Sequence, residues 1–131
     1  MSQVLADIKY TKSHEWAQLL SNGVIEIGIT DHAQHALGEV VFVEVPIVGR
    51  EIVAAEACAV IESTKAASDV YSPIGGTVVA VNDTLGAAPE LINQDCYLQG
   101  WLFRVQPISD AEFDSLLNAQ DYIEFLASQG G

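Results

Sequence analysis

Basic residues are scarce in this chain. Five lysines and arginines stand against 18 aspartates and glutamates, which gives a formal net charge of −13 over 131 residues. A surface this acidic repels phosphate backbones and anionic lipid, so the composition argues against nucleic acids and membrane surfaces as partners. It favours partners with basic docking surfaces, whose encounter rates fall as salt rises.

Cysteines and long apolar runs are also few. The two cysteines, Cys58 and Cys96, are too few for a disulfide framework, and we expect both thiols only to pack. No apolar stretch approaches the length of a membrane span, and the first seven residues lack the order of a signal peptide. We therefore expect a cytoplasmic protein, bacterial in origin, with a processed mitochondrial form as the alternative.

Motifs of common enzyme sites are missing. No segment has the glycine spacing of a phosphate loop or a dinucleotide fingerprint, and no nucleophile elbow is present. His32 and His35 could share a metal, but nothing in the sequence spaces the further ligands. We interpret them as solvated histidines on a short helix and expect a protein that is not an enzyme.

Half of the residues are hydrophobic, which predicts a packed core within one domain spanning residues 1–131. Extended runs rich in β-branched residues alternate with turn signals, as is typical of a mostly β protein. In the last such run, Trp101, Phe103 and Val105 should share one face, and Pro107 should end the strand. The predicted strands are residues 8–10, 24–29, 40–45, 57–61, 70–74, 76–81 and 100–105.

Two helical segments are predicted. Thr30-Asp31 can cap a short helix that runs to Leu37, and Gly38 would end it in the left-handed conformation. Ser109-Asp110-Ala111-Glu112 has the pattern of a capping box. It predicts a helical segment over about residues 110–127, in one piece or in two pieces broken near Asn118, while residues 86–95 should form a loop. Its apolar stripe would consist of Phe113, Leu116, Leu117, Ile123 and Leu126.

A short repeat suggests internal duplication. The sequence of residues 38–43 recurs at residues 76–81 with the glycine and three valines in the same order. Two half-sheets related in this way would form a flattened sandwich. Any two strands that follow a glycine look similar, so chance similarity is the alternative.

Lys65 lies between these two segments and is one of only three lysines. Extended runs lead into it and away from it, and small polar residues and alanines surround it. This pattern predicts a tight turn between two strands that presents one amine to another protein. An ordinary surface lysine in a hairpin is the plainer interpretation.

Several blocks of the sequence closely resemble the H-protein family of the glycine cleavage system. They occur in the family's order and run from about Ile8 to the C-terminal helical segment. Two positions depart from the family's usual pattern: Thr64 stands where valine is usual, and Ala36 stands where some members carry a histidine. The matching blocks are His14-Glu15-Trp16, residues 28–34, residues 37–46, residues 62–73 and Gly100-Trp101-Leu102.

This resemblance implies a flattened antiparallel β-sandwich, the barrel-sandwich hybrid of lipoyl and biotinyl carriers. It implies that Lys65 carries lipoate in a covalent amide and that the chain is a non-catalytic, monomeric shuttle. The implied partners are a glycine decarboxylase (P-protein), an aminomethyltransferase (T-protein) and a dihydrolipoyl dehydrogenase (L-protein). A lipoate ligase or a lipoyl transferase and synthase would attach the group.

The resemblance also suggests site residues. Glu15, Ser13 and Asp69 match positions that line a cleft for the aminomethyl cargo; they could instead be a solvated acid and ordinary turn residues. Glu62 and Asp69, which flank the lysine, are candidates for recognition by the lipoylating enzyme.

Two related families fit less well. Lipoyl domains of 2-oxo acid dehydrogenases typically show Asp-Lys-Ala at the site, where this chain has Thr64-Lys65-Ala66. Biotin carriers surround the lysine with methionines, and the only methionine here is Met1. A lipoyl domain, or a lipoate-relay protein serving 2-oxo acid dehydrogenase complexes, is the alternative function.

Overall fold

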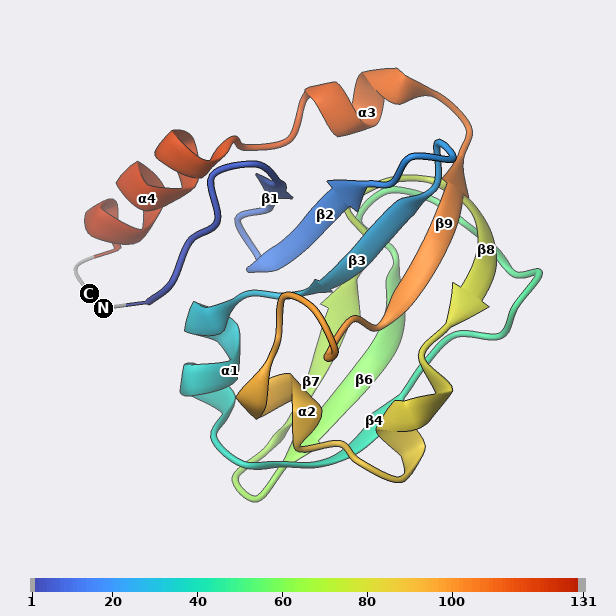
Figure 1. Cartoon of the computed structure of the whole chain (residues 1–131). Coiled ribbons are helices and arrows are strands. Elements are labelled where there is room, and N and C mark those ends of the chain that lie inside the picture. The colour runs from blue at the N-terminus through green and yellow to red at the C-terminus, as the bar shows by residue number, and fades with distance from the viewer. Residues whose placement is uncertain (1, 130–131) are drawn as a thin grey trace.

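Two antiparallel sheets form the centre of the fold (Figure 1). The computed structural model describes residues 2–129, and within them nine strands form a six-stranded and a three-stranded sheet. The larger sheet has the order β1 (Lys9–Tyr10), β2 (Glu15–Leu19), β3 (Ile25–Ile29), β9 (Phe103–Pro107), β8 (Gly76–Val81) and β5 (Glu51–Ile52). The smaller sheet has the order β4 (Val40–Glu44), β6 (Ala57–Ser63) and β7 (Ala67–Tyr71). The predicted mostly β, antiparallel fold is confirmed.

The main core lies between the two sheets. Alternating side chains of the larger sheet, such as Ile27 and Phe103, pack in one buried cluster with Ile61 and Val70 of the smaller sheet. Burial of apolar surface on the facing sides of both sheets is the force that holds such a sandwich together. The two segments of the predicted repeat fall in different sheets, as β4 and β8, which two half-sheets require. The duplication itself stays a prediction.

The helices lie around the sheets (Figure 1). They are α1 (Asp31–Leu37), the 3₁₀ helix η1 (Asp83–Gly86), α2 (Leu91–Gln94), α3 (Asp110–Asp114) and α4 (Ala119–Ser128). A second buried cluster joins α4 to the edge of the larger sheet, where Tyr10 stacks on Tyr122 with ring centroids 4.5 Å apart. This cluster fixes the N-terminal strand that leads towards the site.

The observed helix ends agree in part with those predicted from the sequence. Thr30 caps α1 by accepting a hydrogen bond from Ala33 N, as predicted. Gly38 ends α1 with φ +81°, but its ψ is −155°, so the chain leaves in an extended direction and not in a left-handed turn. The C-terminal segment is in two pieces, and Asn118 caps the second by accepting from Asp121 N.

The predicted capping box forms only halfway. Ser109 Oγ accepts from Ala111 N, but the Glu112 carboxylate accepts from Gly75 N at 2.8 Å and does not reach back to residue 109. A long-range partner thus replaces the local one. Ile123, placed in the apolar stripe by its spacing, is 45% exposed, whereas Phe113 and Leu116 pack on the main core.

Four elements have no counterpart in the sequence prediction: β2, the two-residue strand β5, the 3₁₀ helix η1 and α2. β2 contains glutamate, alanine and glutamine, which do not favour strands, and its pairing with β3 decides its conformation. α2 lies within the predicted loop 86–95 and is a single turn, too short for a helical period to show in the sequence.

The last strand is displaced from its predicted position. β9 begins at Phe103 and extends to Pro107, which pairs with Gly76 at the start of β8. Trp101 precedes the strand and packs on the second cluster, with Arg104 Cζ 4.0 Å from its ring centroid, whereas Phe103 and Val105 face the main core. The prediction that these three residues share one face was therefore wrong.

Candidate functional site around Lys65

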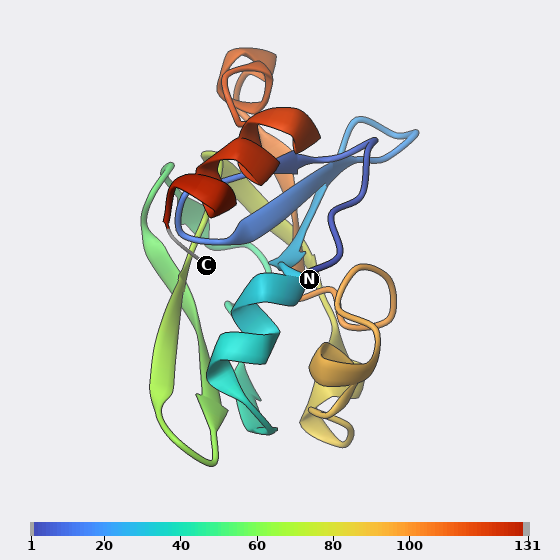
Figure 2. The ribbon, with the colours of Figure 1, turned by 90° about the vertical axis from the view of Figure 1, so that its left-hand side faces the viewer.

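Lys65 occupies the turn of the β6–β7 hairpin, as predicted, and Figure 2 shows this hairpin beside α1. The turn is closed by Ser63 N donating to Ala66 O at 2.8 Å. Ser63 Oγ also accepts from the backbone N–H groups of Lys65 and Ala66, both at 3.2 Å. A further bond from Thr64 N to Glu39 O ties the turn to the segment before β4. The lysine therefore stands on a firmly held turn.

The Lys65 amine lies at the C-terminal end of α1. Its Nζ donates to the carbonyl oxygen of Ala36 at 3.0 Å, and the side chain stays exposed. Last-turn carbonyls of a helix have no intrahelical partner, so they accept readily from a cation. This contact joins the hairpin to a helix 29 residues away in sequence.

A cleft of about 210 Å³ begins at this end of α1. It lies between the helix, the β2 end of the larger sheet and the β6–β7 hairpin, and its volume suits a small group. The structure brings three predicted residues together here: Ser13, Glu15 and Asp69. The full lining is Ser13, His14, Glu15, Ile29, Ala33, Ala36, Leu37, Ile61, Ser68, Asp69 and Val70.

Glu15 is the most constrained of these residues, since it is only 2% exposed. Its Oε1 accepts from the hydroxyls of Thr11, at 2.6 Å, and Ser13, and its Oε2 accepts from Tyr71 N at 3.1 Å. The last bond links β2 of the larger sheet to β7 of the smaller one. Burial raises the pKa of the Glu15 carboxyl above its ordinary value of 4.5, and the three hydrogen bonds oppose that rise.

Asp69 and Glu62 lie on the hairpin itself. Asp69 contributes to the rim of the cleft, and both residues are exposed. The register pairs Asp69 with Val60 and Ala67 with Glu62, so alternation places Asp69 and Glu62 on the same outer face of the hairpin. The two acids thus flank the lysine turn on one side, while Glu62 does not line the cleft.

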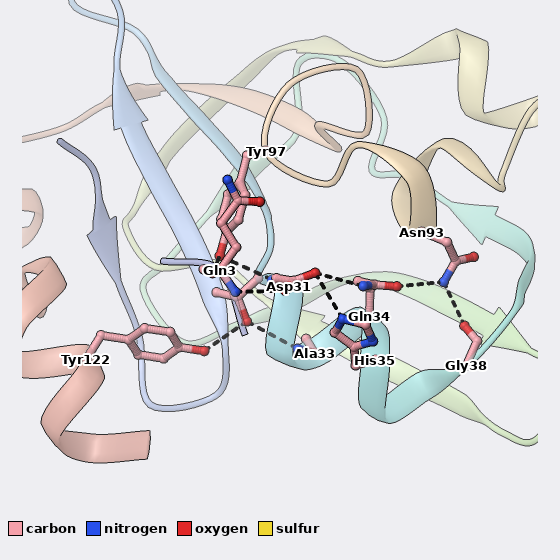
Figure 3. A network of polar contacts seen from close by, with 10 residues as sticks. Gln3, Asp31, Ala33, Gln34, His35, Gly38, Asn93, Tyr97 and Tyr122 are labelled. Carbon is pink, nitrogen blue, oxygen red and sulfur yellow. Dashed lines mark hydrogen bonds and ion pairs between the residues drawn. The ribbon is translucent and has the colours of Figure 1, made fainter. Parts of the chain in front are cut away.

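The end of α1 is fixed by a polar network (Figure 3). Asn93 of α2 donates from Nδ2 to Gly38 O at 2.9 Å and to Gln34 Oε1 at 3.0 Å, and its Oδ1 accepts from Val40 N at 2.9 Å. Gln34 donates in turn to Asp31 Oδ1 at 2.8 Å. Asn93 therefore anchors the C-terminal end of the short helix to α2 and to the start of β4.

Several contributors to the site were missed from the sequence. Thr11 holds Glu15, Ser63 holds the turn, and the backbone carbonyl of Ala36 receives the lysine. Ser63 had a detectable signal, since serine commonly bonds the backbone of a following turn. The other two act through contacts that only the folded chain creates.

One of the two histidines, His32, is less solvated than expected, whereas His35 is exposed as predicted. His32 is half-buried and its ring lies 4.5 Å from that of His14, while His35 is exposed and lies 3.4 Å from the Asp31 carboxylate. Across residues 2–129, no group of three or more histidines, cysteines, aspartates and glutamates is placed to bind a metal ion.

The two cysteines are buried, one in each core cluster. Burial raises the pKa of both thiols to about 12, so they are poor nucleophiles. A larger groove, of about 800 Å³, lies along α4 and the N-terminal end of the chain, and it contains none of the predicted site residues. No helix in the described part of the chain combines the length and hydropathy needed to cross a membrane.

Comparisons with known proteins agree with this geometry. The family model described as glycine cleavage H-protein matches residues 8–129. The chain is 51% identical over 130 residues to the glycine cleavage system H protein of Halorhodospira halophila, covering 99% of this chain and 100% of that protein. It is 53% identical over 122 residues to the H protein of Aromatoleum aromaticum, covering 93% and 94% of the two chains.

A solved structure shares the fold. The crystal structure of a glycine cleavage system H protein from Mycobacterium marinum matches with a TM-score of 0.84 and 37% identity, over 98% of this chain and 100% of that one. The resemblance seen in the sequence is thus confirmed. The chain belongs to the glycine cleavage H-protein family.

Proposed function

We propose that Lys65 carries a lipoyl group in amide linkage and that the chain shuttles the aminomethyl group of glycine between enzymes. The observation that supports this most strongly is the placement of a single exposed amine on a rigid turn at the mouth of a cleft. A flexible arm on a rigid base raises the local concentration of its end at each partner's active site. In this proposal the chain carries the aminomethyl group, and the partner enzymes perform the catalysis.

The proposed partners follow the glycine cleavage cycle. The aminomethyl group comes from a pyridoxal-phosphate glycine decarboxylase and passes to a tetrahydrofolate-dependent aminomethyltransferase. Dihydrolipoyl dehydrogenase then restores the carrier. The lipoyl group, when bound, supplies the two sulfurs on which this transfer depends.

The residues of this chain shelter the cargo in the cleft. Glu15 offers a buried carboxylate that can accept from a cationic amine, and Ser13 adds a hydroxyl beside it. The apolar side chains of Ile29, Leu37 and Val70 exclude water from the same space. Asp69 at the rim can attract the amine as it enters.

The proposal is tested by the mass of the protein from cells grown with lipoate. We expect a mass increase of one lipoyl group and peptide mapping that places it on Lys65. Protein that is unmodified under these conditions, or that is modified at Lys9 or Lys12, would contradict the proposal.

The lipoylating enzyme is proposed to read the outer face of the hairpin, where Glu62 and Asp69 flank the turn. We expect Glu62→Ala and Asp69→Ala to slow lipoylation by a lipoate ligase about two- to tenfold each, as for the loss of one polar contact. The rate is followed by intact mass, with Glu51→Ala, an exposed acid on β5, as the control. Normal rates in both hairpin variants would show that these acids are not recognised.

A further inference from the structure

The C-terminal end of α1 contacts the Lys65 side chain and leaves space for it. The lysine Nζ lies 3.0 Å from the Ala36 carbonyl oxygen. The N–H four residues further along, that of Val40, donates to Asn93 Oδ1 and so does not compete for this carbonyl. The carbonyl is left for the lysine.

Gly38 makes room for the stem of the lysine. A Cβ built at Gly38 would lie 3.0 Å from Lys65 Cε and 3.6 Å from Nζ, so a side chain there would shift the lysine stem from its present position. Gly38 also has φ +81°, and its carbonyl is held by Asn93 Nδ2 at 2.9 Å. The absence of a side chain at Gly38 thus leaves room for the lysine stem, and an asparagine from α2 holds the glycine in place.

Acylation of the lysine preserves this contact. An amide formed on Nζ loses the positive charge but keeps one N–H, which can donate to the same carbonyl oxygen. Ala36 and Leu37, the last residues of α1, also line the cleft. A side chain seated here has its amide at the mouth of the cleft.

We propose that Ala36, Gly38 and Asn93 form a seat that holds the root of the lipoyl-lysine arm and directs it along α1 into the cleft. In its acylated form this inference rests on the proposed lipoylation of Lys65. Gly38 and Asn93 are positioning residues, since neither touches the cargo. The seat is present before the arm is attached.

The chain supplies a matched control for Gly38→Ala. Gly23 has a similar positive φ, +85°, and a Cβ there meets no atom within 4 Å. Gly23→Ala therefore also places a side chain at a positive φ, but it touches no lysine. A difference between the two variants reports the contact with Lys65.

The measurement is hydrogen exchange at the lysine Nζ, followed by NMR in protein labelled with nitrogen-15 in its lysines. The lipoylated protein has one side-chain amide N–H of this kind, because Lys9 and Lys12 stay ammonium ions. We expect this proton to exchange about two- to tenfold faster in Gly38→Ala than in the unaltered chain, as for the loss of one ordinary hydrogen bond. The exchange rate in Gly23→Ala should equal that of the unaltered chain. Equal exchange rates in Gly38→Ala and Gly23→Ala would contradict the proposed seat.

The unmodified protein tests the seat without lipoate. There the Lys65 ammonium should exchange more slowly than that of Lys12, and Gly38→Ala should remove the difference. Failure of this result refutes the seat, whereas failure to find the lipoyl mass refutes the proposed function, so the two are separable.

A second variant covers the case in which Gly38→Ala does not fold. Asn93→Asp removes the two Nδ2 contacts to Gly38 and Gln34 and keeps an acceptor for Val40 N. We expect faster exchange at Lys65 in this variant too. Exchange equal to that of the unaltered chain would contradict the seat.

Discussion

Glu15 holds a carboxylate at the wall of the cleft, and its charge is what suits it to a cationic cargo. We expect Glu15→Gln to fold, because the hydroxyls of Thr11 and Ser13 can turn to donate to or accept from the amide. The aminomethyl group should be lost from the loaded variant about three- to tenfold faster, since a charge-assisted hydrogen bond becomes a neutral one. The decay is followed by the mass of the loaded carrier over time.

Glu51→Gln is the control for this prediction, because Glu51 is exposed on β5 and does not line the cleft. Its loaded form should decay at the rate of the unaltered chain. An unchanged decay rate in Glu15→Gln would show that the carboxylate does not protect the cargo.

The burial of Glu15 also predicts a pH dependence of stability. Its pKa is raised in the folded state, so the folded protein binds more protons than the unfolded chain above about pH 4.5. The free energy of unfolding must then decrease as the pH rises towards and through the pKa of Glu15 in the folded state. Below the pKa of Glu15 in the unfolded chain, this contribution does not change with pH. The unfolding free energy of the unaltered chain minus that of Glu15→Gln, from urea titrations at several pH values, should decrease with rising pH in this window. A difference that increases with pH would contradict the raised pKa.

At the level of elements, α4 supports the segment that carries the cleft residues. The Tyr122 hydroxyl lies 2.8 Å from both Thr30 Oγ1 and His14 Nδ1, and Tyr10 and Leu117 exchange two backbone hydrogen bonds. His14 stands between Ser13 and Glu15 with φ +72°, a conformation that side chains rarely adopt. Contacts with α4 therefore help to hold the backbone at the cleft.

This arrangement predicts the effect of Tyr122→Phe. The fully buried hydroxyl and its two bonds would be lost while the ring could still stack on Tyr10, so we expect unfolding to become easier by about 1–2 kcal/mol. Tyr71→Phe is the matched control, since Tyr71 is 40% exposed, and it should change stability by less than about 0.5 kcal/mol. Equal free energies of unfolding for the two variants in urea would show that the buried hydroxyl contributes nothing.

Elements with strong local signals could be predicted from the sequence. β3 alternates cleanly, Thr30 and Asn118 have the side chains of helix caps, and the turn at Lys65 is bounded by extended runs. β2 could not be predicted, because its conformation comes from pairing with β3 and β1. Glu112 was wrongly assigned to a local cap because Gly75, its partner, is 37 residues away.

At the level of the whole molecule, the site combines segments that are distant in the sequence. The resemblance to a family suggested Ser13, Glu15 and Asp69 for one cleft, and the fold brings them together. No sequence pattern indicates that the Ala36 carbonyl receives Lys65 or that Asn93 holds Gly38, because these contacts depend on how α1, α2 and the hairpin pack. The scarcity of lysine pointed to the one position on which the proposed function depends.

A carrier role for Lys65 is tested most directly by reconstituting glycine cleavage with purified decarboxylase, aminomethyltransferase and dihydrolipoyl dehydrogenase. Lys65→Arg keeps the positive charge and the fold but offers no amine for acylation. Lys12→Arg, at another exposed lysine, is the control. We predict that, after treatment with lipoate ligase, Lys12→Arg supports glycine cleavage at the rate of the unaltered chain and Lys65→Arg supports none. Glycine cleavage sustained by Lys65→Arg would contradict the carrier role.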